Sequence, residues 1–269
     1  MMSKEIKSSI IILLVSVMTI IMLPSKYEVI VAVLASITAA SIGYLLKSII
    51  VDFNLLKLIF SIYFKRTGFI RFSISYLYRI ENKGKFLLVR SNRIKDYFQP
   101  VGGAYKYFEN ASEKFNKWDI RKDDKIKVDD KSDGDLRLQV PKKNVLKFLH
   151  WYRKAENREI SCNREFYEEL IQDDILSKEN FPYVQYRKIK ERTTGLQYSK
   201  YFKCWEILIF DIVEPVLNDA QKKEIEELYK KGNSENHIWA DAQMIESEGH
   251  NLNAKEHEYR FGTQTKYII

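Results

Sequence analysis

The chain has 269 residues, of which 45% are hydrophobic, enough for a large buried core in one large or two small domains. Its two cysteines lack CxxC spacing, which excludes a disulfide scaffold and favours a reducing compartment. The net charge is +8, and residues 1–71 hold eight Lys or Arg against three Asp or Glu, which favours an anionic membrane surface over a nucleic-acid groove.

Two apolar runs open the chain, at about 8–23 and 29–46, and each approaches the roughly 20 residues that span a bilayer. Only a short turn separates them, so we expect an antiparallel transmembrane hairpin over 1–50. A signal peptide is the alternative for the first run, but no small-x-small cleavage site follows Leu23. Small residues along the second run suit close helix packing, also between chains, which favours a homo-oligomer.

Basic residues flank the expected hairpin at both outer ends. Lys4 and Lys7 precede the first run, whereas only Lys26 lies in the turn. The positive-inside rule then places both ends in the cytoplasm, so we expect a two-pass membrane protein with a cytoplasmic domain. Residues 51–70 are expected to form a juxtamembrane helix or linker. The apolar stretch 49–64 is interpreted as an interfacial helix or a continuation of the second span, with a buried core helix as the alternative.

The next part of the sequence has the period of β-strands. Residues 72–80 and 85–91 are rich in β-branched and aromatic side chains and predict two strands around a turn. A short strand over 97–99 runs into Gly102 and Gly103. Glycines there allow the backbone to approach a phosphate or a metal, so both are candidate ligand-binding residues.

A charged and aromatic stretch follows the glycines. Residues 118–135 predict a mobile loop, 136–140 a strand and 141–156 a helix. The predicted buried face of that helix consists of Val145, Leu149 and Tyr152. Its other faces carry Lys147 and Trp151, and basic residues interleaved with aromatic ones are suited to gripping phosphates and stacking bases. These two are candidate ligand-binding residues, with an ordinary amphipathic helix as the alternative.

A short helix-forming run from Arg164 to Leu170 concentrates acidic residues. On a helix Glu165, Glu168 and Glu169 stand at i, i+3 and i+4, so three carboxylates share one face. Such carboxylates repel one another unless a cation lies between them. Oxygen-only ligation suits Mg²⁺ or Mn²⁺, which usually work on phosphates. An acidic, solvated helix is the alternative.

The C-terminal part predicts strands over 183–192 and 197–213 and a late strand over 237–242. A helix is expected over 219–231, with Asn218 as its N-cap and a glycine at its end. The four histidines show no ligand spacing with one another or with cysteine, so no zinc site is expected.

The glycine pair and the acidic helix together resemble the Nudix box. Gly103 to Glu109 resembles its first part, and Arg164 to Glu169 resembles its second part residue for residue. Two departures stand out, because the usual seven-residue gap has grown to 110–163 and Ile171 stands where the box has its final glycine. The resemblance implies a Nudix-like α/β/α sandwich over 71–269 with an insertion at 110–163. The expected fold class is therefore α+β.

The resemblance also implies roles for the box residues. In Nudix enzymes the box holds Mg²⁺ and directs water at a pyrophosphate. Carried over to this chain, the catalytic residues are Arg164, Glu168 and Glu169, with Arg164 orienting a box glutamate by an ion pair. The implied ligands of a Mg or Mn ion are Glu165, Glu168, Glu169 and the Gly102 carbonyl. Glu109 is implied to support the loop that contains Gly102 and Gly103, called the glycine loop below.

A double span followed by a divergent Nudix domain resembles the SMODS-associated Nudix proteins, which are encoded beside cGAS-like nucleotidyltransferases in bacterial CBASS antiphage systems. The resemblance implies an effector in the inner membrane whose Nudix-like domain senses a cyclic oligonucleotide. Its spans would then cluster and disrupt the lipid bilayer, which causes abortive infection. The alternative is a membrane-bound, Mg-dependent pyrophosphohydrolase acting on a nucleoside diphosphate derivative. No nucleic-acid motif is present, so no DNA partner is expected.

Overall fold

The computed structural model describes residues 4–22, 27–92, 94–125, 132–250 and 259–269, and the side chains of 4–7 and 44–56 are outside that description. The chain divides into two compact units, Met1–Arg66 and Thr67–Ile269. Each unit has its own internal packing, and each is therefore described by itself.

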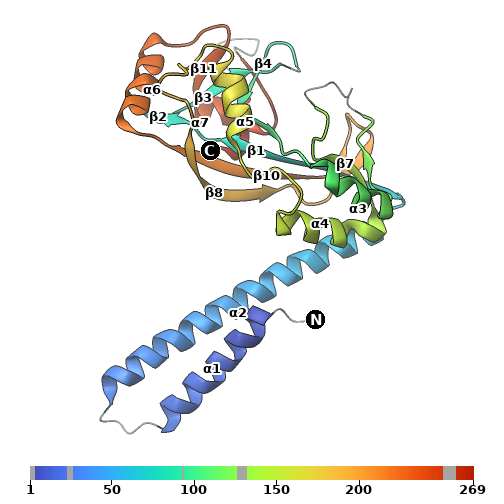
Figure 1. The fold of residues 1–269 in the computed structure, drawn as a ribbon, viewed down its shortest axis with the longest axis vertical. Helices are drawn as coiled ribbons and strands as arrows, with labels where there is room; N and C mark the ends of the chain where they lie inside the picture. The colour runs from blue at the N-terminus through green and yellow to red at the C-terminus, as the bar shows by residue number, and fades with distance from the viewer. Residues whose placement is uncertain (1–3, 23–26, 93, 126–131, 251–258) are drawn as a thin grey trace. The chain divides into compact units, whose positions relative to one another are not determined.

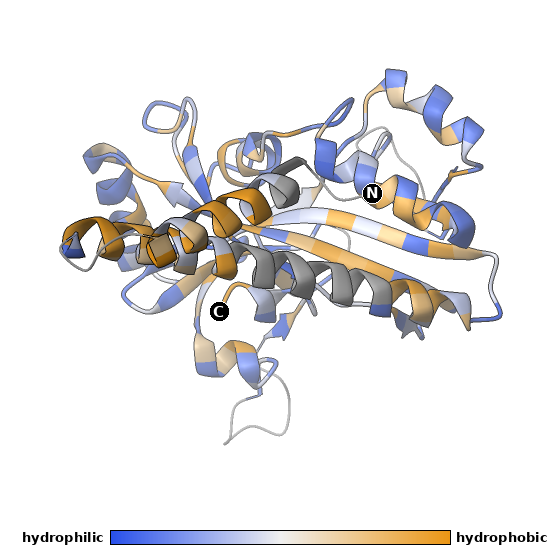
Figure 2. Ribbon diagram, turned by 90° about the horizontal axis from the view of Figure 1, so that it is seen from below, coloured by the Kyte–Doolittle hydropathy of each residue, from blue (hydrophilic) through white to orange (hydrophobic). Residues whose placement is uncertain are grey.

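The first unit is a pair of helices, α1 (Lys4–Met22) and α2 (Glu28–Tyr63). Apolar residues lie along both helices, as Figure 2 shows. Ser16 of α1 and Thr38 of α2 join the pair through hydroxyl groups 2.9 Å apart. Thr38 also donates to the Leu34 carbonyl at 2.8 Å within α2.

The transmembrane hairpin predicted for these residues is wrong. Within the residues described, neither α1 nor α2 has a stretch both long and apolar enough to cross a membrane. The first turns of α1 include Lys4, Glu5 and Lys7, which leave an apolar part shorter than the roughly 20 residues that a span requires. The two-pass inner-membrane location fails on the same finding. Leu23 and the side chains of 44–46, which belong to the predicted spans, are outside the described part.

The second unit is an α+β domain with two mixed sheets (Figure 1). The larger sheet has the strand order β6-β7-β1-β10-β8, with β5 paired to β1 and β9 paired to β10. Its strands are β1 (Phe69–Tyr78), β5 (Gly102–Ala104), β6 (Arg121–Lys122), β7 (Arg137–Pro141), β8 (Gln185–Thr193), β9 (Gln197–Ser199) and β10 (Cys204–Val216). The fold is thus α+β, as expected.

The smaller sheet has the order β11-β3-β4-β12, with β2 paired to β3. Its strands are β2 (Glu81–Asn82), β3 (Lys85–Arg90), β4 (Tyr97–Pro100), β11 (His237–Asp241) and β12 (Arg260–Phe261). Apolar side chains from both sheets share one core, among them Leu77, Leu88, Ile212 and Ile238. Burial of this apolar surface is the main term that holds the two sheets together.

Short helices complete the domain. They are η1 (Glu109–Ala111), α3 (Ser112–Lys117), η2 (Lys142–Asn144), α4 (Val145–Lys154), α5 (Asn163–Phe166), the π-helical turn η3 (Tyr167–Ile171), α6 (Asp219–Lys231), α7 (Ala242–Glu246) and η4 (Thr265–Tyr267). The predicted helix 219–231 is confirmed as α6, with Asn218 in a capping box with Gln221.

Strand β1 organises the whole domain because it is paired along both of its edges. It runs parallel to β10, with Ser73 opposite Leu208. On its other edge the first half pairs with β7 and the second half with β5, where Tyr76 is opposite Gly103. Nearly every residue of β1 is buried, which is typical of a strand covered on both faces. The glycine loop and the 110–163 region are thus both attached to one strand.

The stretch 118–135, which we predict as a mobile loop, is partly ordered. Arg121 and Lys122 form β6, which pairs antiparallel with β7. Asp123, the next residue, is buried, and its carboxylate accepts from the Arg71 guanidinium at 2.6 Å. This buried ion pair and the β6–β7 pairing are contacts between distant residues, which a charged composition does not reveal. Residues 126–131 of the predicted loop are outside the described residues.

Candidate functional site

The glycine loop lies where β1 and the acidic helix approach each other. Gly102 has a φ of +147°, and a Cβ there would lie 2.1 Å from the Tyr76 carbonyl oxygen of β1. A Cβ on Gly103 would lie 2.1 Å from Oε1 of Glu165. The missing side chain of Gly102 therefore allows the backbone of β1 to lie close, and that of Gly103 allows the Glu165 carboxylate to lie close. The neighbours at this loop are protein groups, and the predicted binding of a phosphate or a metal by Gly102 and Gly103 stays a prediction.

The acidic run folds as one continuous helical segment in which α5 passes into η3. The Gln172 amide donates to the Tyr167 carbonyl five residues earlier at 3.0 Å, which marks the π-helical turn. Phe166 and Leu170 are both buried, as predicted for one shared face. The Phe166 ring packs 5.1 Å from Tyr78 of β1, so this apolar face fixes the helix against the larger sheet.

Arg164 holds the start of this helix to the glycine loop. Its guanidinium donates to Oε1 of Glu165 at 2.6 Å, to the Ala104 carbonyl at 2.7 Å and to Glu159 at 3.2 Å. Burial alone would lower the pKa of Arg164. The charge of Glu165 and the hydrogen bond to Glu159 together outweigh burial, so the pKa is raised above its ordinary value. The ion pair implied by the Nudix resemblance is therefore present. A catalytic role for Arg164 stays a prediction.

Glu169 is buried directly under the glycine loop. Its Oε2 accepts the backbone N–H of Gly102 at 2.8 Å, and its Oε1 accepts from the Gln99 amide at 3.3 Å. Burial, followed by the charge of Glu165, raises its pKa to about 8, although the two hydrogen bonds act in the opposite direction. At neutral pH this carboxyl group is therefore largely protonated.

The box carboxylates do not fit a three-ligand metal site in this arrangement. Glu165 is paired with Arg164, Glu169 faces the Gly102 N–H, and Glu168 lies 3.7 Å from the Arg164 guanidinium. In the described part of the chain no three His, Cys, Asp or Glu residues are grouped so that they could hold a metal ion. Glu165 and Glu169 thus accept hydrogen bonds from protein donors, whereas Glu168 has only the more distant charge of Arg164. The metal-ligand assignment of Glu165, Glu168, Glu169 and Gly102 remains a prediction.

Glu159 is a site residue that the sequence argument missed. Its carboxylate accepts from Arg164 and also from the backbone N–H of Lys106, at 3.1 Å, so it ties the box helix to the end of the glycine loop. Glu109, which the resemblance puts in a similar supporting role, lies exposed in η1. The signal in the sequence that could have identified Glu159 is its position, because it is the last acidic residue before Arg164 and Glu165.

Lys147 and Trp151 both line a pocket on α4, away from the box helix. The predicted burial of Val145, Leu149 and Tyr152 is confirmed, but Trp151 is also buried, so the apolar face of α4 is wider than predicted. The Trp151 ring packs against Phe115 and Phe148, with centroids 4.7 and 5.7 Å away. The pocket and the box are thus two separate places in the same domain.

A buried polar network missed by the sequence argument lies beside the box. The Tyr105 hydroxyl donates to Oδ2 of Asp211 at 2.9 Å, and the Lys188 ammonium pairs with Oδ1 at 2.6 Å. Cys162 is buried against the Tyr105 hydroxyl, and burial raises the pKa of its thiol to about 11. Such a thiol is a packing residue and a poor nucleophile, in line with the interpretation of a lone cysteine.

The protonation of Glu169 gives a testable pH dependence. Its carboxyl has a pKa of about 8 when folded against an ordinary value of 4.5, so the native state binds this proton more tightly than the unfolded chain does. Its stabilising contribution is complete below the unfolded pKa and is lost as the pH rises through the folded pKa. We expect the free energy of unfolding to fall by roughly 4 kcal/mol from this group between pH 5 and pH 8.5.

Urea denaturation across this pH range checks the expectation. Glu169→Gln, which keeps an acceptor for the Gly102 N–H, is expected to remove the fall. Glu227→Gln on the exposed face of α6 is the matched control and is expected to leave it unchanged. An unaltered pH slope in Glu169→Gln would contradict a neutral buried carboxyl.

The glycine loop, the two mixed sheets and the Arg-Glu-x-x-Glu-Glu helix define a Nudix-type domain. Residues 69–269, about three quarters of the chain, match the family model described as the SMODS-associated NUDIX domain. The chain belongs to this family, which links it to the CBASS-associated Nudix proteins. Nudix domains commonly use divalent metals, and the family match covers both parts of the box. None of the curated proteins matches this sequence.

Proposed function

We propose that this chain is a CBASS-linked effector whose Nudix-like domain senses a cyclic oligonucleotide and leaves it intact. The observation that carries this proposal is the contact between Glu169 and the Gly102 N–H at 2.8 Å. It leaves a box residue of the predicted metal set buried and in contact with the glycine loop. A carboxyl group that already binds a backbone N–H of this loop is suited to a binding switch.

The switch follows from competition for one donor. A phosphate oxygen that reaches the glycine loop competes with Glu169 for the Gly102 N–H, because both are acceptors for the same hydrogen. Ligand binding would therefore release Glu169 and change the contacts of η3. A ligand shifts a conformational equilibrium only through its different affinity for the two states, and this contact supplies such a difference. Self-association is the response that we propose for the activated state.

A divalent-metal-dependent nucleotide pyrophosphohydrolase is the second candidate function. The hydrogen bond from Arg164 to the Ala104 carbonyl, at 2.7 Å, favours it, because it keeps the acidic helix against the glycine loop as the Nudix box requires. In this candidate Glu165, Glu168 and Glu169 would have to leave their present partners. A hydrolase thus requires all three glutamates of the box to change partners, whereas the sensor requires only the release of Glu169 from the Gly102 N–H.

Binding and product analysis on the same samples separate the two candidates. The full-length chain is titrated with a panel of cyclic di- and trinucleotides and nucleoside diphosphate sugars, with MgCl₂, MnCl₂ or EDTA. Calorimetry, chromatography of the nucleotides and sedimentation are then measured. We expect one cyclic nucleotide to bind, to be recovered intact and to increase the sedimentation coefficient. A metal-dependent product that is lost in Glu168→Gln, but kept in Glu227→Gln, would contradict the sensor and establish the hydrolase.

A further inference from the structure

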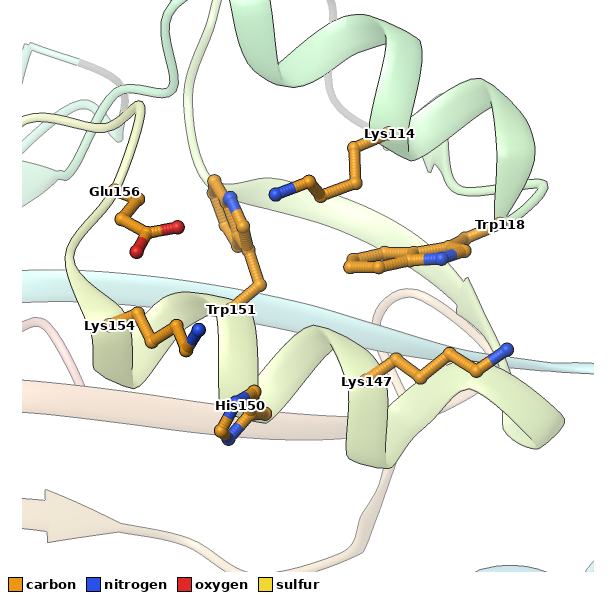
Figure 3. Close-up of a pocket in the computed structure, with 7 residues that line it drawn as sticks. All are labelled: Lys114, Trp118, Lys147, His150, Trp151, Lys154 and Glu156. Atoms are coloured by element: carbon orange, nitrogen blue, oxygen red, sulfur yellow. The ribbon is translucent and has the colours of Figure 1, made fainter.

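A pocket with a cavity volume of about 200 Å³ lies between α3 and α4 of the 110–163 region. Its lining residues are Lys114, Trp118, Lys147, His150, Trp151, Lys154 and Glu156. Figure 3 shows Trp118 and Lys147 near one end of the pocket and Glu156 near the other, with the Trp151 indole rising from α4 towards Lys114. Two indoles and three ammonium groups therefore surround one small hollow.

The charge of the pocket is strongly positive and unneutralised. Three lysines face a single carboxylate, that of Glu156. Over the described residues, no ion pair is formed by the ammonium group of Lys114, Lys147 or Lys154, whereas many other lysines of the domain are paired. Unpaired ammonium groups around one hollow attract an anion, since their positive potentials add there.

The aromatic groups of the pocket are held in fixed positions. Trp118 is half-buried at the end of α3, and its carbonyl accepts from the Asn144 amide at 2.8 Å, which fixes the backbone of that end. Trp151 is only 2% exposed and packs against two phenylalanine rings. Its Nε1–H is buried and has no acceptor. A buried indole N–H without a partner is unusual in a folded domain and lies at the pocket lining.

We propose that this pocket is a second binding site, which takes one base and one phosphate of a nucleotide. The base stacks on the exposed face of the Trp118 indole, and the phosphate lies at the end of the pocket near Lys147, away from Glu156, where Lys114 must turn from the Trp151 indole to reach it. A carbonyl or ring nitrogen of the base, or a phosphate oxygen, supplies the acceptor that Trp151 Nε1–H lacks once Lys114 turns to the anion. Stacking on an aromatic ring together with lysine contacts is the combination by which proteins bind a single unstacked nucleotide.

The proposal of this site is argued from the residues of α3 and α4, whereas the choice of a cyclic nucleotide as probe rests on the proposed function. The full-length chain is titrated with 3′,3′-cyclic di-AMP, AMP and inorganic pyrophosphate, with tryptophan fluorescence and calorimetry as readouts. We expect both nucleotides to quench tryptophan fluorescence. Trp118→Leu should weaken their binding by about tenfold through the lost stacking, and should leave the weak binding of pyrophosphate unchanged.

Lys147→Gln is the second variant, and it removes one exposed ammonium group without touching the core. It is expected to weaken nucleotide and pyrophosphate binding together by several-fold. Lys143→Gln, an exposed lysine of the same region that does not line the pocket, is the matched control and should bind as the unaltered chain does. This pair keeps the test valid even if Trp118→Leu fails to fold.

Four outcomes would overturn the proposal. Pyrophosphate binding as tightly as the nucleotides, with Trp118→Leu unaltered, would make the pocket an unspecific anion patch. Binding of oligonucleotides alone, without the cyclic or mononucleotide, would make it a polynucleotide surface. Nucleotide binding that is unchanged in Trp118→Leu and Lys147→Gln would assign all binding to the box, which leaves the proposed sensor intact. No nucleotide binding at all would overturn both proposals.

Discussion

Gly102→Ala is expected to lower the free energy of unfolding by roughly 3–5 kcal/mol, the combined cost of a positive φ and of overpacking. The φ of +147° is outside the range that L side chains readily adopt, and the new Cβ would lie 2.1 Å from the Tyr76 carbonyl oxygen. That neighbour is backbone within the most buried strand of the sheet, so it has little freedom to move away. Relief requires β5 to separate from β1, which also removes the Gly102 N–H from Glu169.

Two other glycines are the controls for this expectation. Gly68→Ala adds a Cβ with no heavy atom within 4 Å and no positive φ, so the midpoint of urea denaturation should stay within experimental error. Gly103→Ala meets the Glu165 side chain and no backbone atom, so relief requires only that this side chain move out of its ion pair with Arg164. It should therefore keep most of the stability but displace Glu165, and weaken nucleotide binding at the box. A denaturation midpoint of Gly102→Ala equal to that of Gly68→Ala would contradict the assigned cause.

Local signals in the sequence predicted the elements that local physics determines. The strand over 85–90 has continuous apolar residues and a glycine turn before it, and α6 has both of its end signals, Asn218 and Gly232. The box helix was recognised from the order of Arg164 and its glutamates, since helical spacing alone places Phe166 and Leu170 on the buried face. These features depend on residues within one or two helical turns.

Features that depend on distant partners were not predictable. The parallel pairing of β1 with β10 joins residues about 135 positions apart, and no local pattern specifies it. The same holds for the burial of Glu169, which depends on the position of the Gly102 N–H. The apolar runs at the N-terminus were interpreted by their composition alone, and that interpretation is overturned because no described helix is both long and apolar enough to cross a membrane. Helical periodicity also placed Trp151 outside the core. Trp151 is buried because Phe115 of α3, a different element, packs against it.

Arg71→Ala is the second large expected effect, again about 3–5 kcal/mol in the free energy of unfolding. The Arg71 guanidinium on β1 donates to Asp123 at 2.6 Å and to Glu206 of β10 at 2.8 Å, and all three side chains are buried. The Phe202 ring covers the guanidinium, with its centroid 4.1 Å away. Truncation leaves two carboxylates buried without a cation, which is the costly way to break a buried ion pair.

The controls distinguish the buried charge from the loss of a long side chain. Arg121→Ala removes an exposed arginine whose partner, Asp119, is also exposed, and should cost below about 1 kcal/mol. Asp123→Asn combined with Glu206→Gln in the Arg71→Met background removes all three charges, and is expected to recover much of the loss because no buried charge is left unpaired. An equal loss in this triple variant and in Arg71→Ala would show that packing around Arg71, and not charge, is the cause.

The Arg71 variant also tests whether the two proposed nucleotide sites are linked. Asp123 belongs to the region that carries the α3–α4 pocket, whereas β1 carries the strand residues that face the glycine loop. Hydrogen exchange of Arg71→Ala should show faster exchange in β6 and β7 than in β5, because the lost ion pair joins the former to the sheet. Nucleotide quenching at Trp118 should then weaken while binding at the box persists. Equal loss at both sites would mean that β1 transmits the change along its length, so that the pocket and the box respond as one unit.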